Sequence, residues 1–233
     1  MATPWTLEKE LCGLAGASCV RDALLGLGII GEQLPEPALE EVHGWRRGGA
    51  ETFIYRFRVV QDDDAHDVVL KAIVAFSTAK SLTELGEDWV ARRRLLQHAG
   101  IATPQLYYSG RALVVEEFIP EGLSGFLKRR PFHSVHLFDQ VIRYAATLEK
   151  HGFCPMAPFH GLRTNGTDVY AVDFGQDLGP PGLSARRGRR LLREAINWLS
   201  KASSQAIDES RATAVFAFHM ADAKSEGTRD LDV

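Results

Sequence analysis

The sequence has few cysteines, and no two of them form a CxxC pair. Cys12, Cys19 and Cys154 make an odd and unpatterned set, which argues against a disulfide framework and against a zinc site. We therefore interpret them as small apolar groups of a protein that resides in a reducing compartment.

The sequence also lacks a long hydrophobic run. The most apolar stretch near its start, residues 11–20, is short, follows the charged residues EKE and has no basic segment before it, so it is a poor signal peptide. No run approaches the roughly 18 apolar residues that a membrane span requires. We expect a cytoplasmic protein without a membrane span.

Positive charge is not in excess. The 233 residues include 27 Lys and Arg against 30 Asp and Glu, with a formal net charge of −3. Because proteins that bind nucleic-acid backbones are usually strongly basic, nucleic-acid binding is not expected as a main role. With 45% hydrophobic and 24% charged residues, the composition is that of an ordinary globular protein. A chain of this length can build a core without a metal or disulfide.

The first half of the sequence predicts helix and then strands. Leucines at near-helical spacing predict a helix at the start, and the proline-containing segment LPEPALEE predicts a break after it. Two runs typical of strands, 52–60 and 67–76, flank the acidic turn QDDDAH and predict a hairpin. A helix is expected from Ser81, which with Glu84 forms a capping box, to a stop at Gly100.

The second half predicts two more hairpins and several helices. The runs QLYYSG and RALVVEEFI predict one hairpin, and the break at 120–122 is the candidate boundary between two lobes. Apolar periodicity predicts a helix over 135–148. Asn165-Gly166 predicts a type I′ hairpin turn. Residues 183–220 predict one or two helices before a frayed tail.

Three features of this order resemble the protein-kinase-like phosphotransferases, which include protein kinases, aminoglycoside phosphotransferases and small lipopolysaccharide-core kinases. They are Lys71 on a strand, EEFIPEG between the lobes, and Asp173-Phe174-Gly175 after a hairpin. The resemblance runs from about Leu39 to Gly175 and implies an α+β, two-lobed protein-kinase-like fold. The implied regions are an N-terminal helical extension (1–38), an N-lobe with a small antiparallel sheet and one helix (39–120), a reduced helical C-lobe (121–220) and a frayed tail (221–233).

The resemblance implies binding of ATP with Mg²⁺ and transfer of the γ-phosphoryl group to a hydroxyl. This chemistry needs positive charge on the phosphates, a carboxylate that holds Mg²⁺ and a residue that orients the acceptor. Lys71 lies in the apolar strand VVLKAIV, where an unpaired ammonium is costly to bury. By resemblance it contacts the α/β-phosphates, although a snorkelling edge lysine is an alternative. By resemblance Asp173 holds Mg²⁺, and a coincidental strand-end aspartate is the alternative.

Further nucleotide contacts follow from the resemblance. Gly48 and Gly49 lie where these folds place the loop over the phosphates, and glycine lets backbone N–H groups approach an anion. A plain hairpin turn is the alternative there. The backbone of Glu117 and Ile119 would hydrogen-bond adenine. Glu87 is named as the acid that pairs with the strand lysine, although it also fits a solvated surface glutamate.

The catalytic loop departs from the family pattern. When KHGFCPMAPFHGL is aligned by the preceding helix end, Ala157 takes the place of the family's aspartate and Leu162 that of its asparagine. A second register puts Leu162 at the aspartate. In either register the aspartate is missing. His160 is the nearest titratable substitute, and a hydrogen-bonded structural histidine is the alternative.

A basic run follows the metal aspartate. Arg186, Arg187 and Arg190 would suit an anionic substrate or partner, or they form a solvated helix face with ordinary ion pairs. Two functions stay open. The chain is an ATP-dependent phosphotransferase for a small-molecule or protein hydroxyl, or it is a pseudokinase that binds nucleotide, or nothing, and acts through its surface on another protein.

Overall fold

The structure is a computed structural model that divides into two compact units. Unit 1 comprises Met1–Val90 and Pro104–Phe118, and unit 2 comprises Ala91–Thr103 and Ile119–Val233. The structure describes residues 7–30, 38–41, 47–48, 52–61, 64–73, 81–110, 113–130, 134–153, 155, 157–173 and 190–221. In this part of the chain, no helix has both the length and the apolar character needed to cross a membrane.

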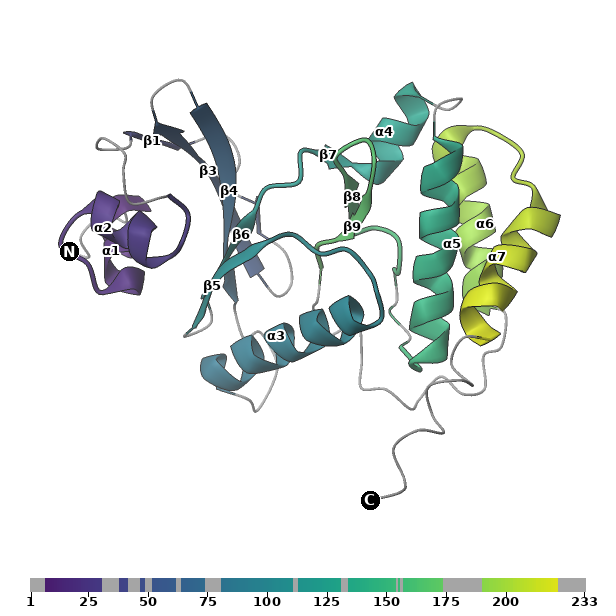
Figure 1. The fold of residues 1–233 in the computed structure, drawn as a ribbon, viewed down its shortest axis with the longest axis horizontal. Helices are drawn as coiled ribbons and strands as arrows, with labels where there is room; N and C mark the ends of the chain where they lie inside the picture. The colour runs from purple at the N-terminus through teal and green to yellow at the C-terminus, as the bar shows by residue number, and fades with distance from the viewer. Residues whose placement is uncertain are drawn as a thin grey trace, which may run out of the picture. The chain divides into compact units, whose positions relative to one another are not determined.

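Unit 1 is built on an antiparallel sheet (Figure 1). Its strands are β1 (Ala38–Glu41), β2 (Arg47–Gly48), β3 (Thr52–Gln61), β4 (Asp64–Ile73), β5 (Leu106–Gly110) and β6 (Leu113–Glu117). They follow the order β1-β3-β4-β6-β5, and β2 also pairs with β3. Both predicted hairpins, β3–β4 and β5–β6, are confirmed. The first is tighter than expected, because its pairing continues to Gln61 and Asp64 inside the predicted turn.

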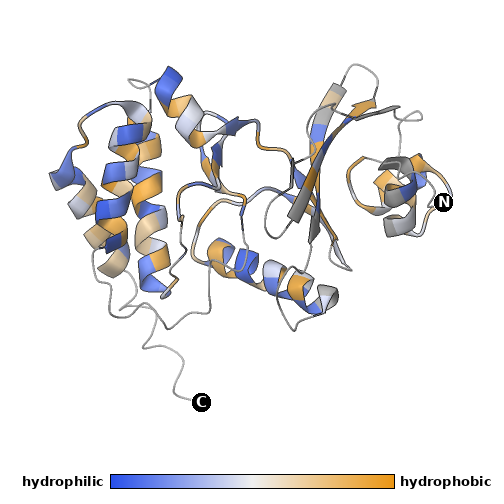
Figure 2. Cartoon of the chain, turned by 180° about the vertical axis from the view of Figure 1, so that it is seen from behind, coloured by the Kyte–Doolittle hydropathy of each residue, from blue (hydrophilic) through white to orange (hydrophobic). Residues whose placement is uncertain are grey.

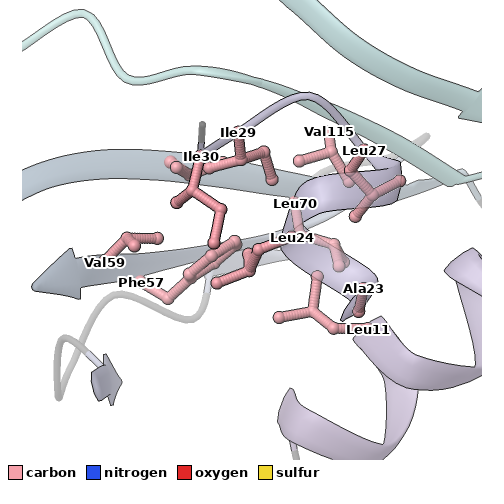
Figure 3. Close-up of a cluster of buried hydrophobic side chains, with 11 residues drawn as sticks. Leu11, Ala23, Leu24, Leu27, Ile29, Ile30, Phe57, Val59, Leu70 and Val115 are labelled. Atoms are coloured by element: carbon pink, nitrogen blue, oxygen red, sulfur yellow. The ribbon is translucent and has the colours of Figure 1, made fainter. Parts of the chain in front are cut away.

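Helices cover the two faces of this sheet. They are α1 (Leu7–Ala15), α2 (Val20–Gly26) and the first half of α3 (Leu82–His98). Figure 1 shows α1 and α2 on one side of the strands and α3 on the other. The residues predicted as a separate extension thus share a core with the sheet: Leu11 and Leu24 pack with Phe57, Leu70 and Val115, all 1% exposed or less (Figure 3).

Strand alternation decides which side chains face α3. Successive residues of a strand point to opposite faces, so Lys71 lies opposite to its neighbour Leu70, which faces α1 and α2. Lys71 pairs with Val114 on β6, and side chains at such paired positions share a face. Glu116, two residues beyond Val114, lies on that face too. Apolar residues of α3 cover it, among them the buried Trp89.

The predicted start of α3 is confirmed as a capping box. The backbone N–H of Ser81 donates to Glu84 Oε2 over 2.7 Å, and the N–H of Glu84 donates to Ser81 Oγ over 3.3 Å. These reciprocal bonds satisfy backbone donors that the first turn of a helix leaves without partners. After α3 the chain turns at Gly100, whose φ of +74° lies in the left-handed region that glycine tolerates.

Unit 2 consists mainly of helices. They are α4 (Leu123–Arg129), α5 (Val135–Lys150), α6 (Arg190–Ser203) and α7 (Glu209–Ala221), and a small antiparallel sheet joins β7 (Glu121–Gly122), β8 (Leu162–Thr164) and β9 (Val169–Ala171) in that order. The predicted helix over 135–148 is confirmed, and it buries an apolar side. Figure 2 shows both hydrophobic and hydrophilic residues along α5 and α6, as expected of helices with one buried side.

The hairpin β8–β9 is confirmed, but the predicted type I′ turn is wrong. That turn needs positive φ at both central residues. Gly166 has a φ of +101°, whereas Asn165 is not among the described residues with positive φ. Instead, Asn165 Oδ1 accepts the N–H groups of Thr167 and Asp168 over 2.9 and 2.8 Å. An asparagine side chain, rather than a second left-handed residue, closes the loop.

The predicted α+β class is confirmed. Unit 1 is an antiparallel sheet with helices on it, and unit 2 is mainly helical with one short hairpin-based sheet. The predicted break at 120–122 falls close to the point where unit 1 ends, at Phe118.

Candidate functional site

Lys71 forms a buried ion pair inside unit 1. Its Nζ contacts Glu116 Oε1, and the side chains of Lys71 and Glu116 are 8% and 2% exposed. The indole of Trp89 lies on the helix side, with its ring centroid 5.4 Å from Lys71 Nζ, within the range of a cation–π contact. Because β4 has neighbours on both edges, Lys71 is not an edge lysine that snorkels into water.

The structure does not bring Glu87 to this lysine. Glu87 is exposed on α3, and the α3 residue that contacts Lys71 is Trp89. Two residues along a helix correspond to a rotation of about 200°, so a helix that presents Trp89 to the sheet turns Glu87 away from it. The carboxylate comes from β6 instead. The sequence signal for Glu116 was the strand LVVEE. Side chains alternate between the two faces of a strand, so only one of its two glutamates can lie on the face of Lys71.

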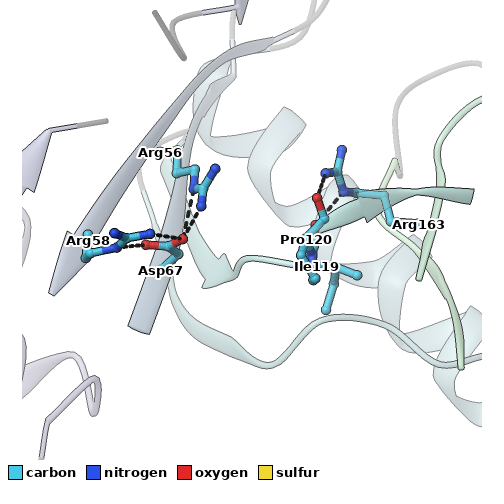
Figure 4. A network of polar contacts seen from close by, with 6 residues as sticks. All are labelled: Arg56, Arg58, Asp67, Ile119, Pro120 and Arg163. Carbon is cyan, nitrogen blue, oxygen red and sulfur yellow. Dashed lines mark hydrogen bonds and ion pairs between the residues drawn. The ribbon is translucent and has the colours of Figure 1, made fainter. Parts of the chain in front are cut away.

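A second group of charged side chains, centred on Asp67 of β4, lies beside the end of β6. Asp67 accepts hydrogen bonds from Arg56 Nε over 3.1 Å and Arg58 Nε over 2.8 Å (Figure 4). Burial acts to raise the pKa of Asp67, but the hydrogen bonds and charges of Arg58 and Arg56 outweigh it and lower that pKa. The Asp67 carbonyl accepts the N–H of Phe118 over 3.1 Å, and the Arg56 guanidinium lies 3.9 Å from the centroid of the Phe118 ring.

The two residues expected to hydrogen-bond adenine already have backbone contacts within their own units. In unit 1, the N–H of Glu117 donates to the carbonyl of Gln105 over 2.9 Å. In unit 2, the carbonyl of the buried Ile119 accepts Arg163 Nε over 2.6 Å (Figure 4). Arg163 Nη2 also binds the next carbonyl, that of Pro120, over 2.8 Å. Arg163 therefore ties this segment to β8.

A pocket in unit 2 brings together the residues expected at the catalytic loop. Its volume is about 230 Å³, and the residues that line it include Ala157, His160, Leu162 and Asp173. His160 and Asp173 are both exposed, and Leu162 is buried. One imidazole ring and one carboxylate thus border the same pocket as Ala157, which the resemblance aligns with the family's aspartate.

Gly161 sets the approach of the loop to Asp173. A Cβ placed at Gly161 would lie 2.7 Å from the Cβ of Asp173 and 3.6 Å from its backbone nitrogen. The N–H of Val172 donates to the Gly161 carbonyl over 3.4 Å, which holds the two segments together. Sequence reasoning had assigned Gly161 no role, although a glycine beside the candidate histidine was a signal for a close backbone approach.

The residues present fit Mg²⁺ only as part of a complex with phosphates. Magnesium usually keeps several waters and binds proteins through one or two carboxylates together with substrate phosphates. Asp173 is the carboxylate that the resemblance assigns to the metal. Within the described ranges, no group of three or more His, Cys, Asp or Glu side chains is placed to hold a metal, and Leu162, at the asparagine position, offers no ligand atom.

The remaining predicted residues are placed as follows. Gly48 belongs to β2 and pairs with Phe53 of β3, whereas Gly49, Arg186 and Arg187 lie outside the described residues. Arg190 is the first residue of α6 and forms an ion pair with Glu194, one turn further along. That contact matches the alternative of an ordinary charged helix face.

No protein-family model and no curated protein matches the chain. Among solved structures, the chain is similar to the Rio2 kinase–ADP/Mg²⁺–phosphoaspartate complex from Chaetomium thermophilum. The TM-score is 0.47 with 12% sequence identity, and the match covers 90% of this chain and 71% of that chain. A likeness at this level of identity concerns the fold and assigns no role to any residue. It does not single out the aminoglycoside phosphotransferase or lipopolysaccharide-core kinase type.

Proposed function

We propose that this chain is a kinase-like phosphotransferase that binds Mg²⁺-ATP and transfers the γ-phosphoryl group to a hydroxyl of a small molecule or protein. One observation carries the proposal: His160 and Asp173 line the same pocket of unit 2. A proton acceptor and a carboxylate for the metal are two of the groups that phosphoryl transfer requires.

In this proposal His160 replaces the missing aspartate. The acceptor oxygen bonds to the γ-phosphorus, the bond from that phosphorus to the β,γ-bridging oxygen breaks, and ADP leaves with the bond's electron pair. The hydroxyl proton passes to a ring nitrogen of His160. Such base assistance contributes about 10²–10⁴-fold in rate. Bound Mg²⁺ would neutralise charge on the phosphates, with Asp173 as its protein ligand.

Lys71 and the arginines have separate tasks in the proposal. Lys71 of unit 1 donates to the α/β-phosphates, and the backbone of Glu117 and Ile119 contacts the base. Arg190 would attract an anionic acceptor, in competition with its contact to Glu194. The proposal assigns only His160 and Asp173 to the transfer step itself.

A pseudokinase is the second candidate function, and a different observation favours it. Ala157 and Leu162 stand where the resemblance implies an aspartate and an asparagine, and neither side chain can bind a proton or a metal. A protein of this kind would bind nucleotide, or only a partner protein, without transferring phosphate.

Two measurements on the purified chain separate these functions. The first is the shift in melting temperature caused by Mg²⁺-ATP, since a ligand that binds the folded state stabilises it. The second is turnover of ATP, with water or an added alcohol as acceptor. Wild type is compared with Asp173→Ala, His160→Ala and, as a matched control, His136→Ala, which alters an exposed histidine of α5.

The proposal expects Mg²⁺-ATP to stabilise the wild type, His160→Ala and His136→Ala, and to stabilise Asp173→Ala far less. Turnover should fall about 10²–10⁴-fold in His160→Ala and stay at the wild-type rate in His136→Ala. Stabilisation without turnover in the wild type would reject the enzyme and support the pseudokinase. No effect of Mg²⁺-ATP in either measurement would reject nucleotide binding altogether.

A further inference from the structure

The environment of Lys71 is closed on several sides by residues of unit 1. Its side chain is 8% exposed, and the carboxylate that it contacts, Glu116, is 2% exposed. Trp89 of α3 covers the pair from the helix side at 5.4 Å. An ammonium and a carboxylate buried together are stable only with good geometry, because each loses its hydration.

The backbone fixes the positions of both partners. Lys71 and Glu116 lie on neighbouring strands, with Lys71 paired to Val114 and Glu116 paired to Val69. Glu116 is thus the diagonal neighbour of Lys71 on the same face, at a separation that long side chains bridge. The contact needs no acid from α3, whose residue at this place is Trp89.

We propose that Glu116 is the residue that positions Lys71 for the nucleotide's α/β-phosphates. This inference rests on the proposed function, in which Lys71 binds those phosphates. A lysine side chain is long and flexible, so an ammonium that must meet a phosphate gains from being held beforehand. Because the ammonium has three N–H donors, it can bind a carboxylate and a phosphate oxygen together.

The pairing also explains the apolar surroundings. Apolar residues flank Lys71 along β4, with Val69 and Leu70 before it and Ala72 and Ile73 after it, and an ammonium without a partner would be strongly disfavoured there. Glu116 makes the lysine compatible with the core, and Trp89 excludes water from the pair without adding a competing charge. The three side chains therefore act as one arrangement in which only Lys71 contacts the nucleotide.

The test compares two probes, Mg²⁺-ATP and adenosine, by calorimetric titration of the full chain. Glu116→Gln is expected to weaken Mg²⁺-ATP binding about tenfold, as for the loss of one charge-assisted hydrogen bond, and to leave adenosine binding unchanged. In a Lys71→Met background, Glu116→Gln should have no further effect on Mg²⁺-ATP. The control is Glu121→Gln, which removes a surface ion pair with Arg129 and should change neither affinity.

Equal effects of Glu116→Gln on both probes, or no effect on either, would overturn the inference. A second variant, Glu116→Asp, keeps the buried charge pair and serves if the glutamine variant does not fold. It should show a smaller loss that is again confined to Mg²⁺-ATP, and wild-type affinity would overturn the inference. If the wild type binds no Mg²⁺-ATP, the proposed function fails as well. If it binds and only Lys71→Met weakens binding, the inference alone fails.

Discussion

Replacing Gly161 with alanine should disturb Asp173 directly. The new methyl carbon would lie 2.7 Å from the Cβ of Asp173, about 1 Å inside the optimal carbon–carbon separation of roughly 3.5–4.0 Å. That Cβ is attached to the backbone, so it cannot rotate away as the tip of a long side chain would. The end of the hairpin has to shift, and overpacking of this kind costs about 1–3 kcal/mol.

The control substitution is Gly125→Ala in α4. There the nearest atom to a new Cβ is Arg129 Nη1 at 3.6 Å, an ordinary contact. Alanine inside a helix is favoured over glycine by about 0.8–1.0 kcal/mol. The two glycine-to-alanine changes are therefore expected to alter the free energy of unfolding with opposite signs, which urea denaturation at neutral pH measures.

The same pair of variants also tests the site. A displacement of about 1 Å at a group that must meet its ligand reduces rates on the order of 10²-fold. Gly161→Ala should therefore lose turnover and most of the melting shift caused by Mg²⁺-ATP, whereas Gly125→Ala should keep both. A Gly161→Ala protein as stable as the wild type would show that the loop and Asp173 are not in close contact and would refute this reasoning.

Three further predictions concern unit 1. Lys71→Met or Glu116→Leu alone should destabilise by about 3–5 kcal/mol, and the double variant far less, because only the single changes leave a buried charge unpaired; additive effects in denaturation of the four proteins would contradict the pair. Asp67→Asn should cost about 1–2 kcal/mol at pH 7, since Arg58, 42% exposed, is screened by water. Because the folded pKa of Asp67 lies below its unfolded value of about 3.9, this stabilisation is complete well above that value, and the gap between the two proteins should narrow as the pH falls below about 4. Ser81→Ala should lower stability by about 1 kcal/mol through loss of the cap, and unchanged melting would contradict the capping box.

Features set by residues close in sequence were predictable. The capping box needs only Ser81 and Glu84, three residues apart, and both partners satisfy backbone groups of one turn. The helix over 135–148 follows from its own apolar periodicity, which requires no knowledge of what packs against it. The type of the turn at Asn165 was an exception. Its side chain accepts backbone N–H groups of the loop, in place of the second residue with positive φ that a type I′ turn needs.

Features set by strand register were not predictable in the same way. The partner of Lys71 depends on which residue of β6 lies opposite β4, and that pairing is fixed by the whole sheet. The resemblance directed attention to α3 and to Glu87, whereas helix phase presents Trp89 to the sheet. Similarly, the importance of Gly161 depends on its close approach to Asp173, just after β9, which the spacing of residues does not reveal.

The positions of Lys71 and Asp173 depend on contacts of different kinds, an ion pair with Glu116 and a close approach to Gly161. Lys71 depends on an opposite charge, so its position should respond to any change that removes or moves the Glu116 carboxylate. Asp173 lies against Gly161, where a new Cβ would be 2.7 Å from its own Cβ, so its position should respond to volume added at Gly161. Substitutions at the two places should therefore affect nucleotide binding through separate units, and their effects on the free energy of unfolding should add, because Lys71 and Glu116 belong to unit 1 and Gly161 and Asp173 to unit 2.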